Sequence, residues 1–285
     1  MTRVSTDPIQ KIRRRGFLAT LAAGGLAAHP GIAVVESTPD GFKLGVASYS
    51  LRRFDRTTAI SIIKQLHTPY ANIKEFHLPI RSTPGEIFAA RKEFEDAGLI
   101  ILGGGNISFQ KDDEDDFRHK FEYARLAGMP VIVCAPTAGT LPKLEKYVKE
   151  YNIKIAVHNH GKTDKHFPSP QSVLKAVNGM DPRCGLCLDV GHTAEYGVDV
   201  VESIRESGSR LLDIHIKDLR DMSDAETQVP VGEGRMPIAA IFRELVRMHY
   251  KGGVMLEYEA EENDPLPGMA KSFAYMRGAL AGMQV

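Results

Sequence analysis

The sequence predicts one α/β domain, a (β/α)8 TIM barrel, preceded by an N-terminal signal segment. Short apolar runs alternate with amphipathic helical segments, and eight such pairs follow one another without a linker. This alternation is typical of a parallel sheet covered by helices. The chain has 285 residues, which suits a single barrel because that fold needs about 250 residues. We therefore expect an export signal and linker in residues 1–38 and the barrel in residues 39–285.

The first half of the barrel is predicted from apolar runs and helix-capping residues. Its strands are expected at residues 43–48, 72–76, 99–105 and 130–135. Helices should follow at residues 57–66, 83–97, 112–126 and 141–151. Thr57 is the expected cap of the first helix, and Thr83 with Glu86 matches a capping box for the second. The third strand ends in three glycines, which we interpret as a turn packed closely at the barrel mouth and not as a nucleotide-binding loop.

The second half repeats the same order, but polar residues stand at the strand ends. The fifth strand is followed at once by His158, Asn159 and His160. Strands are expected at residues 153–157, 184–189, 211–217 and 252–257. The helices between and after them are expected at residues 169–177, 198–206 and 237–249, with a long polar loop at residues 218–230.

Four residues of metal-binding type lie in or just after separate strands of this second half. They are His158, Asp189, His215 and Glu257. Parallel barrel strands point their C-terminal ends at one cavity, so these side chains should converge on one divalent cation. Two imidazoles and two carboxylates suit Mn²⁺, our first candidate, and also Zn²⁺, Fe²⁺ or Co²⁺; Mg²⁺ is a weaker alternative. Taken singly, each residue could instead be a satisfied polar residue or a helix cap.

Charge and cysteine content favour a small-molecule partner. Lys plus Arg and Asp plus Glu both number 36, which gives a formal net charge of zero. Without a basic stripe interleaved with aromatic residues, we expect no nucleic-acid partner; a homo-oligomer stays open. The three cysteines, Cys134, Cys184 and Cys187, lie in or beside predicted buried strands. We interpret them as core residues and not as a disulfide framework or a zinc site.

The N-terminus has the pattern of an export signal. Three arginines at positions 13–15 precede Gly16, Phe17 and Leu18, and small and apolar residues follow at positions 19–28. This RRxFL pattern is similar to twin-arginine signals, so we expect the protein to be periplasmic or otherwise exported. The apolar stretch is too short to form a stable membrane span. An uncleaved, lipid-held or disordered tail is the alternative.

Four motifs in the second half carry a family resemblance. They are LDVGH at residues 188–192, HIKD at 215–218, VGEG at 231–234 and LEYE at 256–259. With them, the chain from about residue 43 onward resembles the sugar phosphate isomerase and epimerase superfamily of xylose isomerase-like TIM barrels. This superfamily, which includes the AP endonuclease 2 family, also contains endonuclease IV.

The resemblance implies a metal held by Glu, Asp, His and Glu from the fifth to eighth strands. The last three positions fall on Asp189, His215 and Glu257, whereas His158 stands where the first Glu is usual. In the epimerases the two glutamates also transfer protons on opposite faces of the substrate. Glu257 can keep that role here.

An imidazole whose lone pair binds metal is a poor base, so the opposite proton-transfer role should pass to another residue. The candidates are His160, Lys217 and Lys74. The resemblance also assigns His192 and Arg235 to the substrate, and we add Asn159 and Lys74 as substrate-binding candidates. Lys217 could instead form only an ion pair with Asp218, and Lys74 could simply face away from the cavity.

The leading hypothesis is a metal-dependent sugar isomerase or epimerase, which removes a proton next to a carbonyl and forms an enediolate. A metal-dependent lyase that cleaves 3-keto-glycosides by β-elimination is the second hypothesis, favoured by the missing glutamate and the predicted export. The third is a non-catalytic periplasmic sugar-binding barrel. Endonuclease activity is disfavoured by the neutral charge and by the number of ligands.

Overall fold

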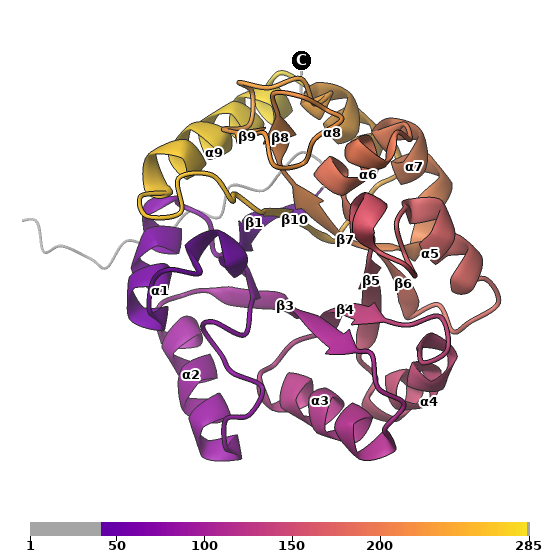
Figure 1. Ribbon diagram of the computed structural model, residues 1–285. Coiled ribbons are helices and arrows are strands. Elements are labelled where there is room, and N and C mark those ends of the chain that lie inside the picture. The colour runs from indigo at the N-terminus through magenta and orange to yellow at the C-terminus, as the bar shows by residue number, and fades with distance from the viewer. Residues whose placement is uncertain (1–40, 284–285) are drawn as a thin grey trace, which may run out of the picture. The chain divides into compact units, whose positions relative to one another are not determined.

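A computed structural model describes residues 41–283, so the predicted export signal lies outside the described residues. Within them, a closed barrel forms in the strand order β1-β10-β7-β6-β5-β4-β3-β2, with helices around it (Figure 1). The strands are β1 (Lys43–Ala47), β2 (Tyr70–Ile73), β3 (Ile100–Phe109), β4 (Val131–Pro136), β5 (Lys154–His158), β6 (Cys184–Asp189), β7 (Leu211–Ile216) and β10 (Gly253–Leu256). Neighbouring strands are parallel. The predicted TIM barrel is confirmed.

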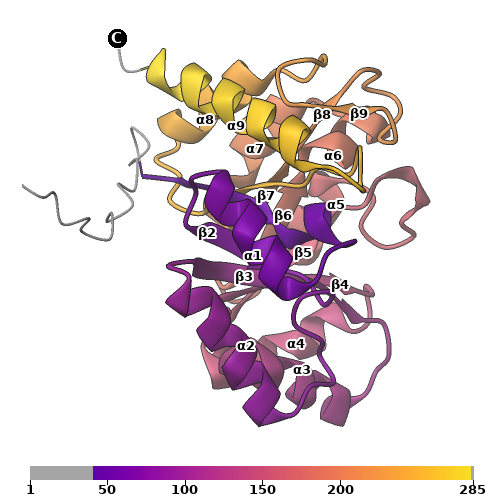
Figure 2. The same ribbon diagram turned by 90° about the vertical axis from the view of Figure 1, so that its left-hand side faces the viewer.

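Helices follow the strands along the chain and cover the outside of the barrel, as the side view shows (Figure 2). They are α1 (Arg56–Gln65), α2 (Pro84–Asp96), α3 (Glu114–Leu126), α4 (Leu141–Tyr151), α5 (Pro170–Ala176), α6 (Val190–Tyr196), α7 (Val200–Ser207), α8 (Ile238–Arg247) and α9 (Leu266–Ala281). Short 3₁₀ helices lie at η1 (Ser48–Leu51), η2 (Gly161–Thr163) and η3 (Gly208–Arg210). No helix within residues 41–283 has the length and apolar character needed to cross a membrane.

Alternation along the strands separates the main core from the barrel interior. In β5, Ile155 and Val157 belong to the large hydrophobic core, whereas Ala156 belongs to a separate small cluster. Side chains of successive strand residues point to opposite faces, so His158 shares its face with Ala156. In β6, Cys187 of the small cluster shares its face with Asp189 in the same way. The polar strand ends therefore project from the face that the main core leaves free.

The glycine run of the third strand is not the turn that the sequence suggested. Residues 103–105 lie inside β3, which continues to Phe109. A Cβ at Gly105 would collide with the carbonyl of Val133, and one at Gly104 would collide with Met129. Close packing against β4 and against Met129 just before it therefore requires these two glycines. The close packing was expected, but it acts within an extended strand.

Several helix ends were predicted correctly, and others were not. Thr83 and Glu86 form the expected capping box of α2. The cap of α1 is Asp55, whose side chain accepts a hydrogen bond from Thr58 N, so the expected Thr57 cap is wrong. Helix α6 begins directly after β6, where no helix was predicted. The polar loop after β7 contains a small antiparallel hairpin of β8 (Asp218–Leu219) and β9 (Gln228–Val229).

The three cysteines are free and buried. This placement agrees with their interpretation as core residues and gives no disulfide framework among the described residues.

Candidate metal centre and active site

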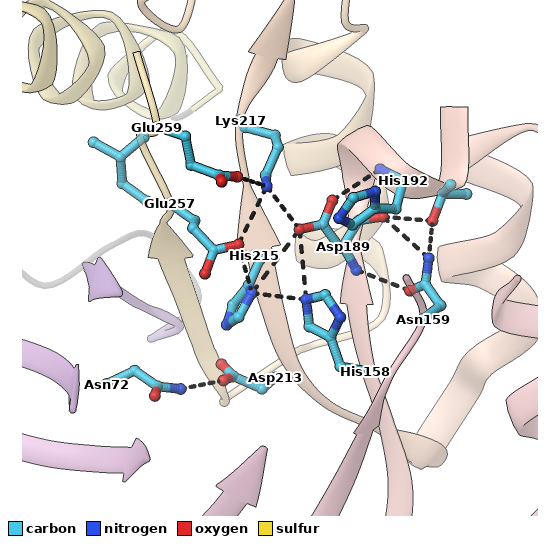
Figure 3. Close-up of polar contacts among 12 residues, drawn as sticks. Asn72, His158, Asn159, Asp189, His192, Asp213, His215, Lys217, Glu257 and Glu259 are labelled. Atoms are coloured by element: carbon cyan, nitrogen blue, oxygen red, sulfur yellow. Dashed lines mark hydrogen bonds and ion pairs between the residues drawn. The ribbon is translucent and has the colours of Figure 1, made fainter. Parts of the chain in front are cut away.

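The four predicted metal ligands converge at the C-terminal ends of β5, β6, β7 and β10 (Figure 3). His158 Nε2 lies 3.1 Å from His215 Nδ1 and 3.6 Å from Asp189 Oδ2. His215 Nδ1 lies 3.1 Å from Glu257 Oε2. All four candidate ligand atoms lie within 4.8 Å of one another, and all four residues are buried. Ligand atoms around one tetrahedral ion with bonds of about 2.1 Å lie about 3.4 Å apart, so the spacing fits one cation.

The protonation states of these side chains also suit a cation. Burial lowers the pKa of His215 to about 4, so its imidazole is neutral, the form that binds metals. Burial opposes ionisation of Asp189, but the Lys217 ammonium and the neighbouring histidines together outweigh burial and hold the pKa of Asp189 well below its usual range. Burial also opposes ionisation of Glu257, yet the contact with His215 and the ammonium groups of Lys74 and Lys217 keep its pKa well below the ordinary value. Two ionised carboxylates and a neutral imidazole form a fitting donor set.

Two buried lysines pair with different oxygens of the Glu257 carboxylate. Lys74 Nζ lies 3.2 Å from Glu257 Oε1, and Lys217 Nζ lies 3.2 Å from Oε2. Lys217 Nζ also lies 3.0 Å from Asp189 Oδ2 and 2.7 Å from Glu259 Oε1. Burial disfavours the charged form of Lys217, but these carboxylates raise its pKa well above the usual value. An ammonium group that keeps its proton donates hydrogen bonds and cannot accept a proton, so the surroundings of Lys217 argue against a role as base.

Asn159 contacts the protein chain around Asp189. Its Oδ1 accepts a hydrogen bond from Asp189 N at 3.0 Å, and its Nδ2 donates to Thr193 Oγ1 at 3.1 Å. Asp189 in turn caps α6, because its Oδ1 accepts from His192 N at 2.9 Å. Asn159, predicted to bind substrate, is fully buried. These bonds fix the position of Asp189.

His160 and His192 lie beside the four converging residues but are not part of that group. Their ring centroids are 4.5 Å apart, and the His192 ring is 5.9 Å from that of His158. His160 is exposed, and His192 Nδ1 lies 3.5 Å from Glu195 Oε2. Gly161, at φ +73°, leaves room for Glu195, which a Cβ there would strike. Both histidines thus lie at the edge of the group of four.

Arg235 lies on a loop and is exposed, outside the group of four. Its backbone is fixed, since Arg235 N donates to Leu219 O at 2.8 Å. The surrounding loop is held by the buried carboxylate of Asp218, which accepts hydrogen bonds from the backbone amides of Gly232, Gly234 and Met236. The alternative of a Lys217–Asp218 ion pair is wrong, because Lys217 pairs with three other carboxylates.

Sequence reasoning missed two polar pairs. Gln228 Nε2 donates to Glu259 Oε1 at 2.9 Å, and Glu259 N donates to Gln228 Oε1 at 2.9 Å, which ties the β8–β9 hairpin to the end of β10. Asn72 Nδ2 donates to Asp213 Oδ2 at 2.7 Å, and burial raises the pKa of Asp213 to about 7. Asp213 precedes His215 by two positions, so strand alternation could have placed it on the same face. No local pattern links Gln228 to Glu259.

Comparisons with known proteins agree with the barrel. A family model described as xylose isomerase-like TIM barrel matches residues 31–279. An inosose dehydratase from Mesomycoplasma hyopneumoniae strain J is 27% identical over 161 residues, which cover 50% of this chain and 53% of that protein. The chain thus spans about half the length of the curated relatives it matches.

Solved structures share the same architecture. A structure of the IolI protein with a bound zinc atom has a TM-score of 0.72 and 17% identity, covering 85% of this chain and 99% of that one. An L-ribulose 3-epimerase structure has a TM-score of 0.69 and 16% identity, covering 85% and 96%. At these identities the likeness shows the fold alone.

Proposed function

Because this chain belongs to the xylose isomerase-like TIM barrel family, we propose that it is a divalent-metal-dependent lyase acting on an oxidised carbohydrate. The enzyme removes a proton from the carbon next to a ketone and expels the oxygen substituent one carbon further on. The relative named inosose dehydratase supports a small polyhydroxylated ketone as substrate. We therefore rank elimination above isomerisation or epimerisation, which was the leading hypothesis from the sequence.

The metal would be held by His158, Asp189, His215 and Glu257, whose ligand atoms lie within 4.8 Å of one another. Mn²⁺ stays our first candidate, and the two-nitrogen, two-oxygen donor set also suits Zn²⁺, Fe²⁺ or Co²⁺. When bound, such a cation polarises a ketone and an adjacent hydroxyl, which lowers the cost of removing the neighbouring C–H proton.

The protein's own groups then move the proton. Glu257 accepts it from the carbon next to the ketone, and the C–H electron pair becomes a C=C bond. The C–O bond to the substituent breaks, and its electron pair stays on the departing oxygen. Lys74, whose Nζ lies 3.2 Å from Glu257 Oε1, donates a proton to that oxygen and recovers one from Glu257. The reaction is redox-neutral and restores both side chains.

One observation carries elimination over epimerisation: the strand-five ligand is an imidazole that faces the other ligands. His158 Nε2 is 3.1 Å from His215 Nδ1 and 3.6 Å from Asp189 Oδ2, so this nitrogen is directed at the metal position. Inverting a carbon requires proton-transfer groups on both of its faces. Glu257 with Lys74 supplies one face, and a metal-bound His158 does not supply the other. His160 lies outside the converging group, and Lys217 is paired with three carboxylates, so neither is placed to replace it. Elimination needs only the first face.

The proposal is tested with metal-loaded protein in D₂O. Methyl 3-keto-glucoside and free ketoses are incubated separately and followed by NMR. The proposal expects methanol release from the keto-glycoside, with loss of the hydrogen on the carbon between ketone and anomeric centre, and no release after chelation. Deuterium incorporation without cleavage would instead support epimerisation. If neither reaction occurs but sugars bind to the metal-free protein, the sugar-binding barrel is the better description.

A further inference from the structure

A pair of aromatic rings lies at the ends of the first two strands. Phe76 follows β2, and its side chain is 57% exposed. Tyr49 follows β1 in the short helix η1. The two ring centroids are 5.7 Å apart at an interplanar angle of 66°, an edge-to-face contact. Single exposed apolar residues are common on proteins, but this one belongs to a packed pair.

Charged and polar contacts fix the residues around the pair. The Arg52 guanidinium lies 4.7 Å from the centroid of the Tyr49 ring, and Arg52 Nη2 donates to Glu262 Oε2 at 3.0 Å. Ser48 Oγ lies 2.9 Å from His77 Nδ1, which joins the segment before Tyr49 to the segment after Phe76. A rigid aromatic surface loses little conformational entropy when a ring packs on it.

Two serines next to Tyr49 are hydrogen-bonded to the backbone that carries the proposed proton-transfer residues. Ser50 Oγ accepts from Tyr258 N at 2.8 Å and donates to Leu256 O at 3.2 Å, so it holds the backbone on both sides of Glu257. Ser48 Oγ accepts from Lys74 N at 2.8 Å. The segment that carries Tyr49 is therefore bonded to the backbone that carries Glu257 and Lys74, and Phe76 follows Lys74 by two residues.

We propose that Tyr49 and Phe76 form a subsite for the leaving group, which is an alcohol that carries a ring with an apolar face. This inference rests on the proposed lyase function. The departing oxygen takes its proton from Lys74, and Phe76 stands two residues after Lys74, so the group attached to that oxygen emerges beside the aromatic pair. Aryl rings and the apolar faces of sugar rings pack well on aromatic side chains, whereas water or methanol gains nothing from them. The substrate is accordingly a keto-glycoside with a ring-bearing aglycone.

The test compares benzyl and methyl 3-keto-glucosides, whose alcohols leave with nearly equal ease. For the Phe76→Ala variant we expect kcat/KM to fall by about three- to tenfold with the benzyl substrate, while the methyl substrate changes by less than about twofold. Phe76→Tyr should keep the benzyl preference. Phe88→Ala removes a phenylalanine of α2 that is 63% exposed, and it should leave both substrates unchanged. A third substrate with a glucosyl aglycone is measured in the same way. Comparing its loss of kcat/KM in Phe76→Ala with that of the benzyl substrate shows whether the subsite favours an aryl ring or a sugar ring.

Equal losses for both substrates, or no loss for either, would overturn the subsite. If wild-type protein cleaves neither keto-glycoside, the proposed lyase function is wrong. The subsite is then tested separately by measuring ligand binding. In that case calorimetry with unoxidised benzyl and methyl β-glucosides should show tighter benzyl binding that is lost in Phe76→Ala. Equal affinities for the two glucosides in wild-type protein would rule the subsite out.

Discussion

Replacing Glu257 with glutamine is expected to lower kcat by about a thousandfold, because the change removes the proposed proton acceptor and a charged metal ligand together. Glutamine keeps the size of the side chain but cannot accept the substrate proton. The substitution also removes a negative charge that balances the ammonium groups of Lys74 and Lys217, each of which lies 3.2 Å from a Glu257 oxygen. Release of aglycone and exchange of the substrate C–H with solvent deuterium are the two readouts, measured alongside metal content.

Glu259→Gln is the matched control. Glu259 also pairs with Lys217, at 2.7 Å, but it is not among the four converging residues. Its replacement should lower kcat by less than about tenfold, since a partly exposed ion pair contributes little. Similar losses in the two variants would mean that the pairing of Lys217, and not proton transfer at Glu257, governs the rate. Full activity in Glu257→Gln would remove Glu257 from the mechanism.

The second large effect is expected for metal binding in His158→Ala. The variant loses one of four protein ligands, and each ligand contributes about a quarter of the binding free energy of such a site. We therefore expect the affinity for Mn²⁺ or Zn²⁺ to fall by roughly a hundredfold or more. The side chain is buried, so circular dichroism and thermal unfolding must show that the variant still folds. Calorimetric titration of the metal-free protein with each cation gives the affinity.

His160→Ala provides the comparison for this variant. His160 stands two positions later, is exposed and does not belong to the converging group. Its removal should leave the metal affinity within about threefold of wild type, because no ligand is lost. Equal weakening in both variants would point to general damage of the β5 loop, and an unchanged affinity in His158→Ala would exclude His158 as a ligand.

Much of the fold could be predicted because strand and helix periodicities are local signals. The apolar runs at β5 and β7 and the capping box of Thr83 with Glu86 depend only on neighbouring residues. The glycines of the third strand were wrongly interpreted as a turn, because a tertiary contact requires them. Strand β4 approaches β3 so closely that a Cβ at Gly105 would strike Val133. The β8–β9 hairpin was missed because its strands are only two residues long.

The convergence of the site was predictable for the same reason that the barrel was. Residues at the ends of adjacent parallel strands must lie close together, and this placed His158, Asp189 and His215 as neighbours. The partners of Lys217 were not predictable from the sequence. Glu259 lies 42 positions away, whereas Asp218 is adjacent in the sequence and was the more obvious partner for an ion pair. Asp218 satisfies backbone amides instead, an arrangement that only the folded loop reveals.

The most direct test of the account is anomalous X-ray diffraction from crystals of metal-loaded protein, collected above and below the absorption edge of the added Mn²⁺ or Zn²⁺. The account predicts one strong peak per chain within bonding distance of His158, Asp189, His215 and Glu257, whose candidate ligand atoms already lie within 4.8 Å of one another. A peak bound elsewhere, or none in protein shown to be folded and active, would contradict it.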